Sequence, residues 1–396
     1  MLSPLNLAER LGRDEFPAQV YHRHYLHVPG ALPAPGELIT WDEVNGIVAT
    51  HRLDPPRLRL SADGEMLPQY RYSTPVVTRR QTVWQRLHPA ELHQRLSEGA
   101  SLVIDAVDEL HPAVGRAAME LEQWLRTGVQ ANLYASWTAR EGFGIHWDDH
   151  DVVVAQVDGS KRWKIYGPTR TAPMFKDTQE PAPPPEKPLT EIVMRAGDLL
   201  YLPRGWWHSV AASEGERSLH LTFGLQTTTG AQLLSWLSED LRRHDVLRLD
   251  LPVHASPQDR ADYLERLKKE VVAALGDPGV LARYMAARDA DDVTRMRPSL
   301  PYIGSVPALP ELRVRLTTAR AHCADTDHGV TFRACGNEWD MAPAAGPLLR
   351  RLISAVPDAV TLGELAATAG VSLEDTAMLV TELVHGQAAA VEGGGA

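Results

Sequence analysis

The sequence contains only two cysteines, Cys323 and Cys335, among its 396 residues. Two thiols are too few for a disulfide framework, which excludes a small disulfide-stabilised secreted fold and predicts free or core thiols in a reducing compartment. No stretch reaches the roughly 18 consecutive apolar residues that a membrane-spanning helix requires. Residues 1–16 also lack the apolar core of a secretory signal peptide. Together these absences predict a cytoplasmic protein without a membrane segment.

Positive charge is scarce as well, because 40 Lys and Arg residues stand against 51 Asp and Glu residues, for a net charge of -11. This balance disfavours broad electrostatic attraction to a phosphate backbone, so nucleic acid is not the expected partner. Hydrophobic residues make up 44% of the chain, which is enough to bury a large core in two or three domains.

The middle of the chain has the pattern of short β-strands separated by Gly and Pro. The predicted strands are residues 131–137, 151–157, 162–167, 191–195, 198–203 and 218–226. The turn signals between them include Asp158-Gly159. Strands that follow one another closely without intervening helices predict a mainly β antiparallel sandwich or barrel. The proline-rich segment 181–188 is interpreted as a stiff surface loop.

Helical patterns precede and follow this β region. Residues 112–127 have apolar side chains at helical spacing, and Asp42 is a candidate cap for a short helix that carries Val44, Ile47 and Val48. After the strands, residues 231–247 and 256–275 are also predicted to be helical. The second of these has Ser256 as its expected cap.

The last part of the chain has the outline of a winged helix: a helix, a turn at Gly370, a second helix and a short strand. The predicted domains are an N-terminal elaboration over 1–95, a catalytic β-barrel over 96–230, a helical region over 231–295 and a winged-helix-like domain over 296–396.

A candidate metal site begins at His146 and Asp148, immediately before a predicted strand. Residues two apart in an extended chain point to the same side, so this imidazole and carboxylate can reach one ion. His208, after a tight turn at the start of a later strand, is the candidate third ligand. Two His and one carboxylate on one face of an octahedral ion are typical of non-haem Fe(II) oxygenases. A His-x-Asp pair by itself is more often a turn or a salt bridge, so the surrounding strand pattern carries the prediction.

The segments 146–163 and 197–208, which read HWDDHDVVVAQVDGSKRW and GDLLYLPRGWWH, resemble the JmjC ribosomal-oxygenase group of cupin-like Fe(II)- and 2-oxoglutarate-dependent hydroxylases. The resemblance covers most of the chain. It implies a double-stranded β-helix, which is a jelly roll with flanking helices, followed by a helical dimerisation region and a winged helix. It also implies Fe(II) held by His146, Asp148 and His208, with 2-oxoglutarate and O2 as cosubstrates, and oxidative decarboxylation to succinate and CO2.

The resemblance extends to the cosubstrate pocket. In that family a basic residue thirteen positions after the Asp ligand binds the distal carboxylate of 2-oxoglutarate, and Lys161 occupies that position. A solvated lysine in a charged turn is the alternative. Four further residues resemble the family's pocket residues: Asn132, Tyr134, Thr222 and His220. For Asn132 a hydrogen-bonded core amide remains an alternative. The chain departs from some relatives at Gly224, where they carry a Ser near the active site, and this leaves the substrate contacts open.

Other residues near the motif are less strongly indicated as part of the site. Asp149 and His150 are expected at the surface or behind the ligands, because the strand phase turns Asp149 away from its neighbours. The tryptophans of this region are expected mainly in the barrel core, with some lining a substrate cleft. They are Trp137, Trp147, Trp163, Trp206 and Trp207.

The resemblance implies an enzyme that hydroxylates a side chain of a protein or peptide, with a ribosomal protein among the candidates, and that forms a homodimer. A hydroxylase of a small molecule or peptide natural product is an alternative, because the fold does not fix the target. A cupin that binds metal without oxygenase activity, or a Zn or Mn enzyme, is another alternative. A DNA-binding regulator built on the winged helix is disfavoured, since residues 301–396 contain six Arg, no Lys and eleven acidic residues.

Overall fold

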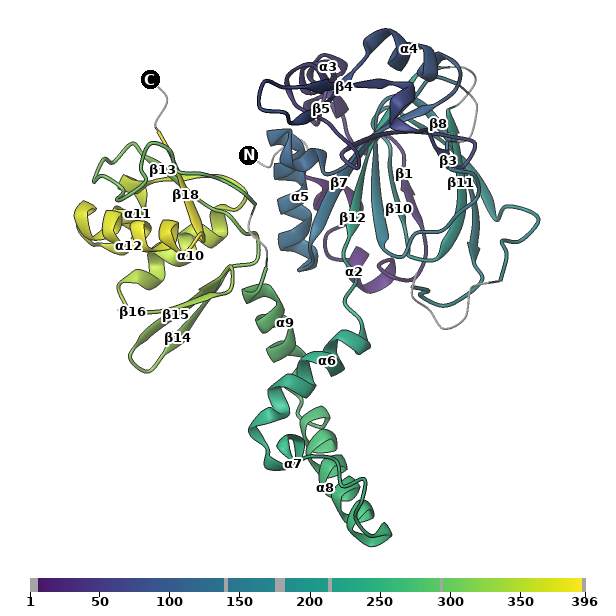
Figure 1. Cartoon of the computed structure of the whole chain (residues 1–396). Coiled ribbons are helices and arrows are strands. Elements are labelled where there is room, and N and C mark those ends of the chain that lie inside the picture. The colour runs from purple at the N-terminus through teal and green to yellow at the C-terminus, as the bar shows by residue number, and fades with distance from the viewer. Residues whose placement is uncertain (1–5, 139–141, 175–181, 213–215, 293–294, 394–396) are drawn as a thin grey trace. The chain divides into compact units, whose positions relative to one another are not determined.

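The computed structural model describes residues 6–138, 142–174, 182–212, 216–292 and 295–393 (Figure 1). Residues 1–5 of the N-terminal segment and Pro181 of the predicted loop lie outside the described residues, and residues 182–188 form no helix or strand. The chain divides into two compact units, Met1–Gln226 and Thr227–Ala396. Each unit is described by itself.

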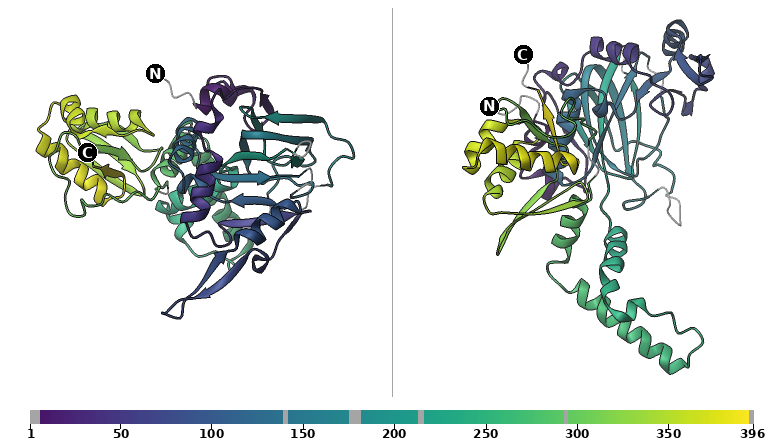
Figure 2. Two further views of the ribbon diagram at one scale, coloured as in Figure 1. Left: turned by 90° about the horizontal axis from the view of Figure 1, so that it is seen from above. Right: turned by 60° about the vertical axis from the view of Figure 1, so that its left-hand side comes forward.

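Antiparallel β structure dominates the first unit, as the sequence predicts. The main sheet runs in the order β1-β10-β8-β12-β7-β6-β2-β3, and β9 and β11 each pair with β8. Its strands are β1 (Leu26–Val28), β2 (Leu58–Ala62), β3 (Glu65–Met66), β6 (Ser101–Ile104), β7 (Val129–Ser136), β8 (Asp151–Pro168), β9 (Thr190–Arg195), β10 (Leu199–Leu202), β11 (Trp206–Ala212) and β12 (Ser218–Leu225). Figure 2 shows these strands and a separate hairpin of β4 (Ser73–Val77) and β5 (Val83–Leu87).

Strand β8 is a single element of 18 residues. Its first half pairs with β10 and β12, and its second half pairs with β9 and β11. The prediction of two strands joined by a turn at Asp158-Gly159 is therefore wrong. Gly159 has a φ of 65°, and a Cβ placed on it would lie 1.7 Å from the carbonyl oxygen of Arg217. The register of the β8–β12 pairing shifts between Leu219 and His220, which leaves Val157 as the extra residue of a bulge two positions before the glycine. The chain therefore continues through a bulge instead of reversing.

Alternate residues of the strands face two different apolar cores, as period-2 geometry requires. The larger core lies between the sheet and the helices and contains Leu133, Leu221 and Phe223. The smaller core contains Val152, Val154, Trp163, Ile165, Ile192, Met194, Leu200 and Leu202. The residues of β7 and β12 that alternate with members of the larger core therefore point to the side of the sheet on which the smaller core lies.

The helices of the first unit are α1 (Leu7–Leu11), α2 (Phe16–Gln19), α3 (Trp41–Thr50), α4 (Pro89–Ser97) and α5 (Pro112–Leu125). The predicted helix over 112–127 is confirmed as α5. The predicted cap of α3 is wrong, because Thr40 is the cap and Asp42 lies in the first turn. Thr40 and Glu43 form a reciprocal capping box, which satisfies two backbone donors where Asp42 would satisfy one. Val44 and Ile47 are buried, as expected.

The second unit begins with α6 (Gly230–Asp240), α7 (Asp245–Arg248), α8 (Pro257–Leu275) and α9 (Val280–Ala290). Ser256 caps α8 by accepting a hydrogen bond from the backbone of Asp259, as predicted. None of the residues of α8 is buried.

The rest of the second unit is a small α/β subdomain. Its strands are β13 (Arg313–Leu316), β14 (His322–Thr326), β15 (Gly329–Ala334), β16 (Asn337–Met341), β17 (Val360–Thr361) and β18 (Ala389–Glu392). Its helices are α10 (Ala345–Ala355), α11 (Leu362–Ala369) and α12 (Leu373–His385). Gly370 ends α11 with a φ of 66°, and the predicted order of helix, glycine turn, helix and strand is present. Cys323 and Cys335 are free thiols, as expected. Within the described ranges, no helix is both long enough and apolar enough to cross a membrane.

Candidate metal centre

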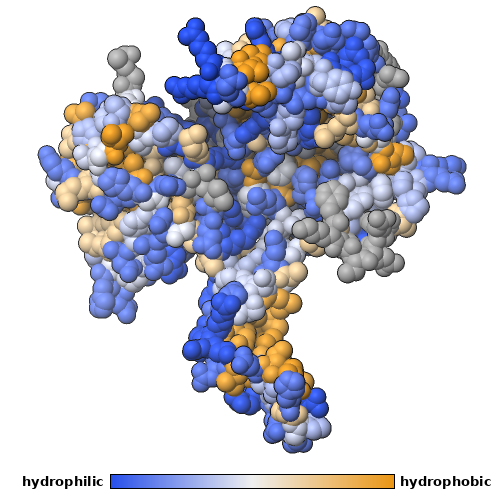
Figure 3. Space-filling view, in the orientation of Figure 1, coloured by the Kyte–Doolittle hydropathy of each residue, from blue (hydrophilic) through white to orange (hydrophobic). Residues whose placement is uncertain are grey.

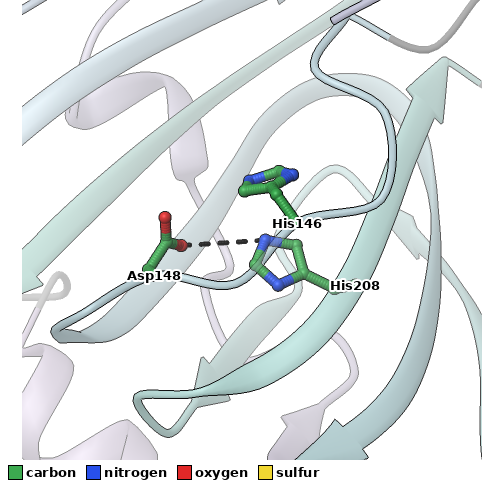
Figure 4. Close-up of side chains that lie close together, drawn as sticks. All are labelled: His146, Asp148 and His208. Atoms are coloured by element: carbon green, nitrogen blue, oxygen red, sulfur yellow. Dashed lines mark ion pairs between the residues drawn. The ribbon is translucent and has the colours of Figure 1, made fainter. Parts of the chain in front are cut away.

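His146, Asp148 and His208 converge in the first unit (Figure 4). His146 and Asp148 lie in the segment that leads into β8, and His208 lies on β11. One ligand atom from each residue lies within 4.8 Å of the other two. The distance from His208 Nε2 to Asp148 Oδ2 is 3.7 Å. The sequence therefore predicts this grouping correctly, although its third member is 60 residues away from the second.

Backbone hydrogen bonds hold the two histidines opposite each other. The amide of His146 donates to the carbonyl oxygen of His208 at 3.0 Å, and the amide of His208 donates back to His146 at 2.8 Å. The carbonyl oxygen of Asp148 accepts from the amide of Gly205, at 2.9 Å, in the turn before β11. The loop that carries His146 and Asp148 is therefore attached to β11 at His146 and to the turn before β11 at Asp148.

The side chains can offer three ligand atoms to one divalent metal. Nδ1 of His146 donates to the carbonyl oxygen of Gly144 at 3.1 Å, and Nδ1 of His208 donates to that of Trp206 at 2.9 Å. These bonds leave both Nε2 atoms available as ligands. Burial, followed by the neighbouring His146, lowers the pKa of His208, which favours the neutral imidazole that binds metal. Two imidazoles and one carboxylate fit Fe(II) and leave coordination positions for other ligands.

A pocket of about 220 Å³ surrounds these three residues. Its wall is formed by Arg59, Ser101, Tyr134, Gly142, Phe143, His146, Asp148, Val152, Lys161, Trp163, His208, Val210, His220 and Thr222. The three candidate ligands, a cation and apolar side chains therefore line one pocket.

Lys161 is buried in this wall and is not a solvated turn residue. It is 5% exposed, and its Nζ donates to Ser136 Oγ at 2.6 Å. Burial lowers the pKa of Lys161 to about 7. Within the described part of the chain, this hydroxyl is the hydrogen-bond partner of the buried amine, and an anion here would gain a charge-assisted hydrogen bond.

Tyr134, His220 and Thr222 also line the pocket, as predicted. The rings of Tyr134 and His220 stack with their centroids 5.0 Å apart. Burial, followed by the charge of Asp148, raises the pKa of Tyr134 to about 12, so this residue keeps its proton at neutral pH. Burial and then Lys161 lower the pKa of His220 well below its usual value. His220 is therefore a neutral ring, and its Nδ1 has no hydrogen-bond partner among the described residues.

Asn132 lies behind the wall and is not part of it. Its Oδ1 accepts from the amide of Ala106 at 2.9 Å and from Gln130 Nε2 at 3.0 Å. It also hydrogen bonds to the side chain of Tyr134. In this structure Asn132 is thus a hydrogen-bonded amide that positions Tyr134, which is the alternative that the sequence leaves open.

The residues next to the ligands lie near the protein surface. His150 Nδ1 and Asp149 Oδ1 are 3.2 Å apart, and both side chains are more than one third exposed. A Cβ on Gly224 would lie 2.9 Å from the ring of His150, so the glycine makes room for this ring. Of the five tryptophans of this region, Trp163 lines the pocket, and its ring lies 5.6 Å from that of His208.

Three wall residues come from segments to which the sequence gives no functional signal. Ser101 begins β6, and Phe143 lies in the segment before His146. Arg59 on β2 forms two hydrogen bonds of 2.9 Å to Asp105. Arg59 and Ser101 reach the pocket through the pairing of β2, β6 and β7, and neither a motif nor a periodicity marks any of the three positions.

Asp151, at the start of β8, is another residue whose structural role the sequence does not predict. It is buried and accepts a hydrogen bond from the hydroxyl of Tyr201 and another, at 2.9 Å, from the amide of Arg204. The ring of His22 lies 2.8 Å away. Burial alone would raise the pKa of Asp151, but the hydrogen bonds from His22 and Tyr201 lower it overall. Asp151 therefore joins the strand after the loop ligands to the turn before His208.

Comparison with known proteins agrees with this geometry. Residues 111–233 match the family model described as the JmjC domain. The bifunctional lysine-specific demethylase and histidyl-hydroxylase NO66 of Aedes aegypti is 31% identical over 178 residues, which is 43% of this chain and 28% of that protein. Ribosomal oxygenase 1 of Gallus gallus is 30% identical over 178 residues, 42% of this chain and 30% of that protein. The matches thus span less than a third of these two relatives.

Among solved structures, the ribosomal oxygenase YcfD from Escherichia coli, in complex with cobalt and 2-oxoglutarate, has a TM-score of 0.62 and 18% identity. The alignment covers 97% of this chain and 99% of that one. A second YcfD structure, with cobalt and succinic acid, gives a TM-score of 0.61 at 18% identity, with 97% and 99% coverage. At this level of identity the comparison confirms the fold over nearly the whole chain.

Proposed function

Because the chain carries a JmjC domain, we propose that it is an Fe(II)- and 2-oxoglutarate-dependent oxygenase that hydroxylates a side chain of a protein or peptide. The convergence of His146, Asp148 and His208 in the same pocket as the buried Lys161 carries this proposal. A metal protein that does not use 2-oxoglutarate has no need of a buried cation beside its metal ligands.

Each group of the site has a role in this reaction. His146, Asp148 and His208 hold Fe(II), and Lys161 binds the distal carboxylate of 2-oxoglutarate. When bound, the iron and the cosubstrate supply oxygen activation, and the oxidation releases succinate and CO2.

The chain itself provides the environment. Lys161 gains a counterion when the carboxylate binds, which offsets the cost of burying its charge. Tyr134, which stays protonated, has a hydroxyl hydrogen to donate to a bound anion. Val152, Trp163 and Val210 line the same space with apolar surface and so limit its water content.

Removal of a metal ligand tests the chemistry. We expect His208→Ala and Asp148→Ala to abolish succinate formation from 2-oxoglutarate, measured by mass spectrometry of the reaction mixture. Asp149→Ala is the matched control, since Asp149 is exposed beside the loop ligands, and it should keep most of the activity. Undiminished turnover in either ligand variant would remove the assignment.

A ribosomal protein is the substrate that we propose, because the relatives include a protein named as a ribosomal oxygenase and others named as histidyl-hydroxylases. Mass spectrometry of ribosomal proteins from a strain that lacks this gene should reveal the loss of a modification of one oxygen atom. If all ribosomal proteins keep the same masses with and without the gene, the substrate belongs to another class, such as a natural product. Such a substrate and the free thiols are consistent with a cytoplasmic location, which we also propose.

We also propose that the protein forms a homodimer through its helical region. Leu264, Val272 and Leu275 fall on one side of α8 and are 59%, 59% and 44% exposed. Figure 3 shows hydrophobic side chains gathered over this part of the second unit. An apolar helix face of this kind is stabilised when a second copy covers it.

A further inference from the structure

The C-terminal subdomain contains a groove that is separate from the metal centre. It has a volume of about 580 Å³ and lies between β16, the start of α10 and α12. Apolar side chains form its floor, among them Trp339, Met341, Leu348, Val371 and Leu379. Trp339 packs against the end of α12, because a Cβ on Gly386 would lie 2.2 Å from its ring. The groove is therefore a defined feature between packed elements.

The rim of this groove is negative. Four exposed carboxylates line it, namely Glu338 and Asp340 on β16 and Asp375 and Glu382 on α12. No Lys, Arg or His appears among the described residues that form the groove. The same surface therefore offers apolar contacts at its centre and a single sign of charge around them.

Most arginines of the subdomain are paired with other carboxylates and do not neutralise this rim. Arg315 pairs with Glu392, Arg320 with Asp289 and Asp292, Arg350 with Asp325 and Arg351 with Glu364. Arg333 pairs with Glu338. Asp340 and Asp375 accept hydrogen bonds from the hydroxyls of Thr331 and Ser372, which carry no charge. At least three negative charges therefore remain uncompensated by these arginines.

Helix α12 contributes both acidic and apolar side chains to this surface. Asp375, Met378 and Glu382 recur at helical spacing, and Met378 is 69% exposed beside the groove. A second helix in a helix-turn-helix pair that reads DNA needs basic side chains on such a face. On α12 this face carries carboxylates and a methionine, which exclude a phosphate backbone and favour a cationic partner.

We propose that this groove binds a basic segment of another protein, with Lys or Arg side chains at the acidic rim and at least one large apolar side chain in the centre. Charge complementarity selects this occupant. The apolar floor distinguishes it from a purely polycationic segment, because burial of the anchor supplies affinity that salt does not screen. This proposal concerns a docking surface and does not rest on the oxygenase function.

Peptide binding to the full chain tests the proposal. The probe is a short fluorescein-labelled peptide in which Lys and Arg alternate with Leu at helical spacing. Two comparison peptides replace either the basic residues by Glu or the leucines by Ser. Fluorescence anisotropy should show binding of the first peptide, no binding of the Glu peptide and weaker, more salt-sensitive binding of the Ser peptide. Equal binding of the Leu and Ser peptides would overturn the role of the apolar floor.

Charge reversal locates the binding site. We expect Asp340→Lys combined with Glu382→Lys to weaken binding about tenfold, because two attractions become repulsions. Glu311→Lys combined with Asp358→Lys makes the same charge change at exposed positions outside the groove and should leave binding unchanged. Equal weakening in both pairs would mean general attraction to an acidic protein and would overturn the proposal. So would full binding by the first pair.

Two further variants distinguish peptide binding in the groove from peptide binding elsewhere on the molecule. Leu379→Ala keeps the charge and should weaken binding several-fold without loss of folding, since Leu379 is only partly buried. His208→Ala removes a metal ligand and should leave binding unchanged. If His208→Ala abolished binding, the peptide would occupy the catalytic pocket instead. Because these assays need neither metal nor turnover, their failure is distinguishable from failure of the oxygenase assignment.

Discussion

Lys161 places an amine inside the first unit, where burial lowers its pKa to about 7. The free protein therefore loses this cation as the pH rises through 7. A bound carboxylate favours the protonated amine and raises its pKa in the complex. In the complex that we propose, binding of 2-oxoglutarate above neutral pH is thus coupled to the uptake of one proton by Lys161.

We expect the dissociation constant of 2-oxoglutarate to rise by up to about tenfold per pH unit above pH 7, because each unit reduces the protonated fraction of Lys161 tenfold. Isothermal titration calorimetry on protein loaded with Mn(II), in buffers of different ionisation enthalpy, measures both the affinity and the proton uptake. Lys161→Arg is the control, since a guanidinium stays charged throughout this range. A pH dependence that persists unchanged in Lys161→Arg would contradict the role of Lys161.

Local motifs identify residues that come together in space, and tertiary pairing decides the rest of the pocket. His146 and Asp148 stand two apart in an extended segment, so the sequence alone implies that their side chains can meet. Asn132 has the strand phase of a pocket residue, but a donor from Ala106 fixes its amide behind Tyr134. The position of Arg59 in the pocket depends on which strand pairs with β6. The residues around Arg59 in the sequence give no indication of that pairing.

At the scale of elements, Asp151 connects three segments through its two carboxylate oxygens. His22, Tyr201 and the amide of Arg204 all contact it. Because Arg204 belongs to the turn that precedes His208, this carboxylate helps to fix the distance between the two ligand-bearing segments.

Replacement of Asp151 by Ala should lower the free energy of unfolding by roughly 3 kcal/mol, since it leaves buried donors without an acceptor. It should also weaken metal binding by about tenfold, as loss of a group that orients ligands does elsewhere. Urea denaturation and a Co(II) titration measure these effects. Asp149→Ala should change stability by less than about 0.5 kcal/mol because Asp149 is exposed. Similar losses in the two variants would show that Asp151 has no special role.

Element prediction succeeded where the periodicity was strong and failed where the tertiary structure decided. Residues 112–125 and 257–275 have clear helical spacing, and both are helices. Asp158-Gly159 has the composition of a turn, but its neighbours on both sides find partner strands, so the chain continues through a bulge. Short strands such as β1 and β3 contain too few residues to give an alternating signal.

At the scale of the whole molecule, α8 exposes apolar side chains along its length and buries none of its residues. Val271 and Ala274 of α8 pack against the small core of Leu237, Leu241 and Val280, so the exposed apolar side chains lie where this core does not cover the helix. The proposed dimer covers this exposed surface.

We expect Leu264→Glu combined with Val272→Glu to convert the dimer into a monomer, because two carboxylates would be buried in an apolar interface. Multi-angle light scattering across a range of concentrations measures the mass directly. Lys269→Gln combined with Ala273→Glu makes the same charge change at other exposed positions of α8 and should remain dimeric. A wild-type protein that is monomeric at every concentration would rule out the dimer.

The continuity of β8 also bears on how this strand responds when a chelator is added. This strand shares ladders with β9, β10, β11 and β12, and Lys161 lies in its middle. Its amides should therefore be among the slowest in the protein to exchange with deuterated solvent, because they open only when several strands separate. We therefore expect the β8 amides on either side of Lys161 to stay protected from exchange when a chelator is added, because strand pairing holds them.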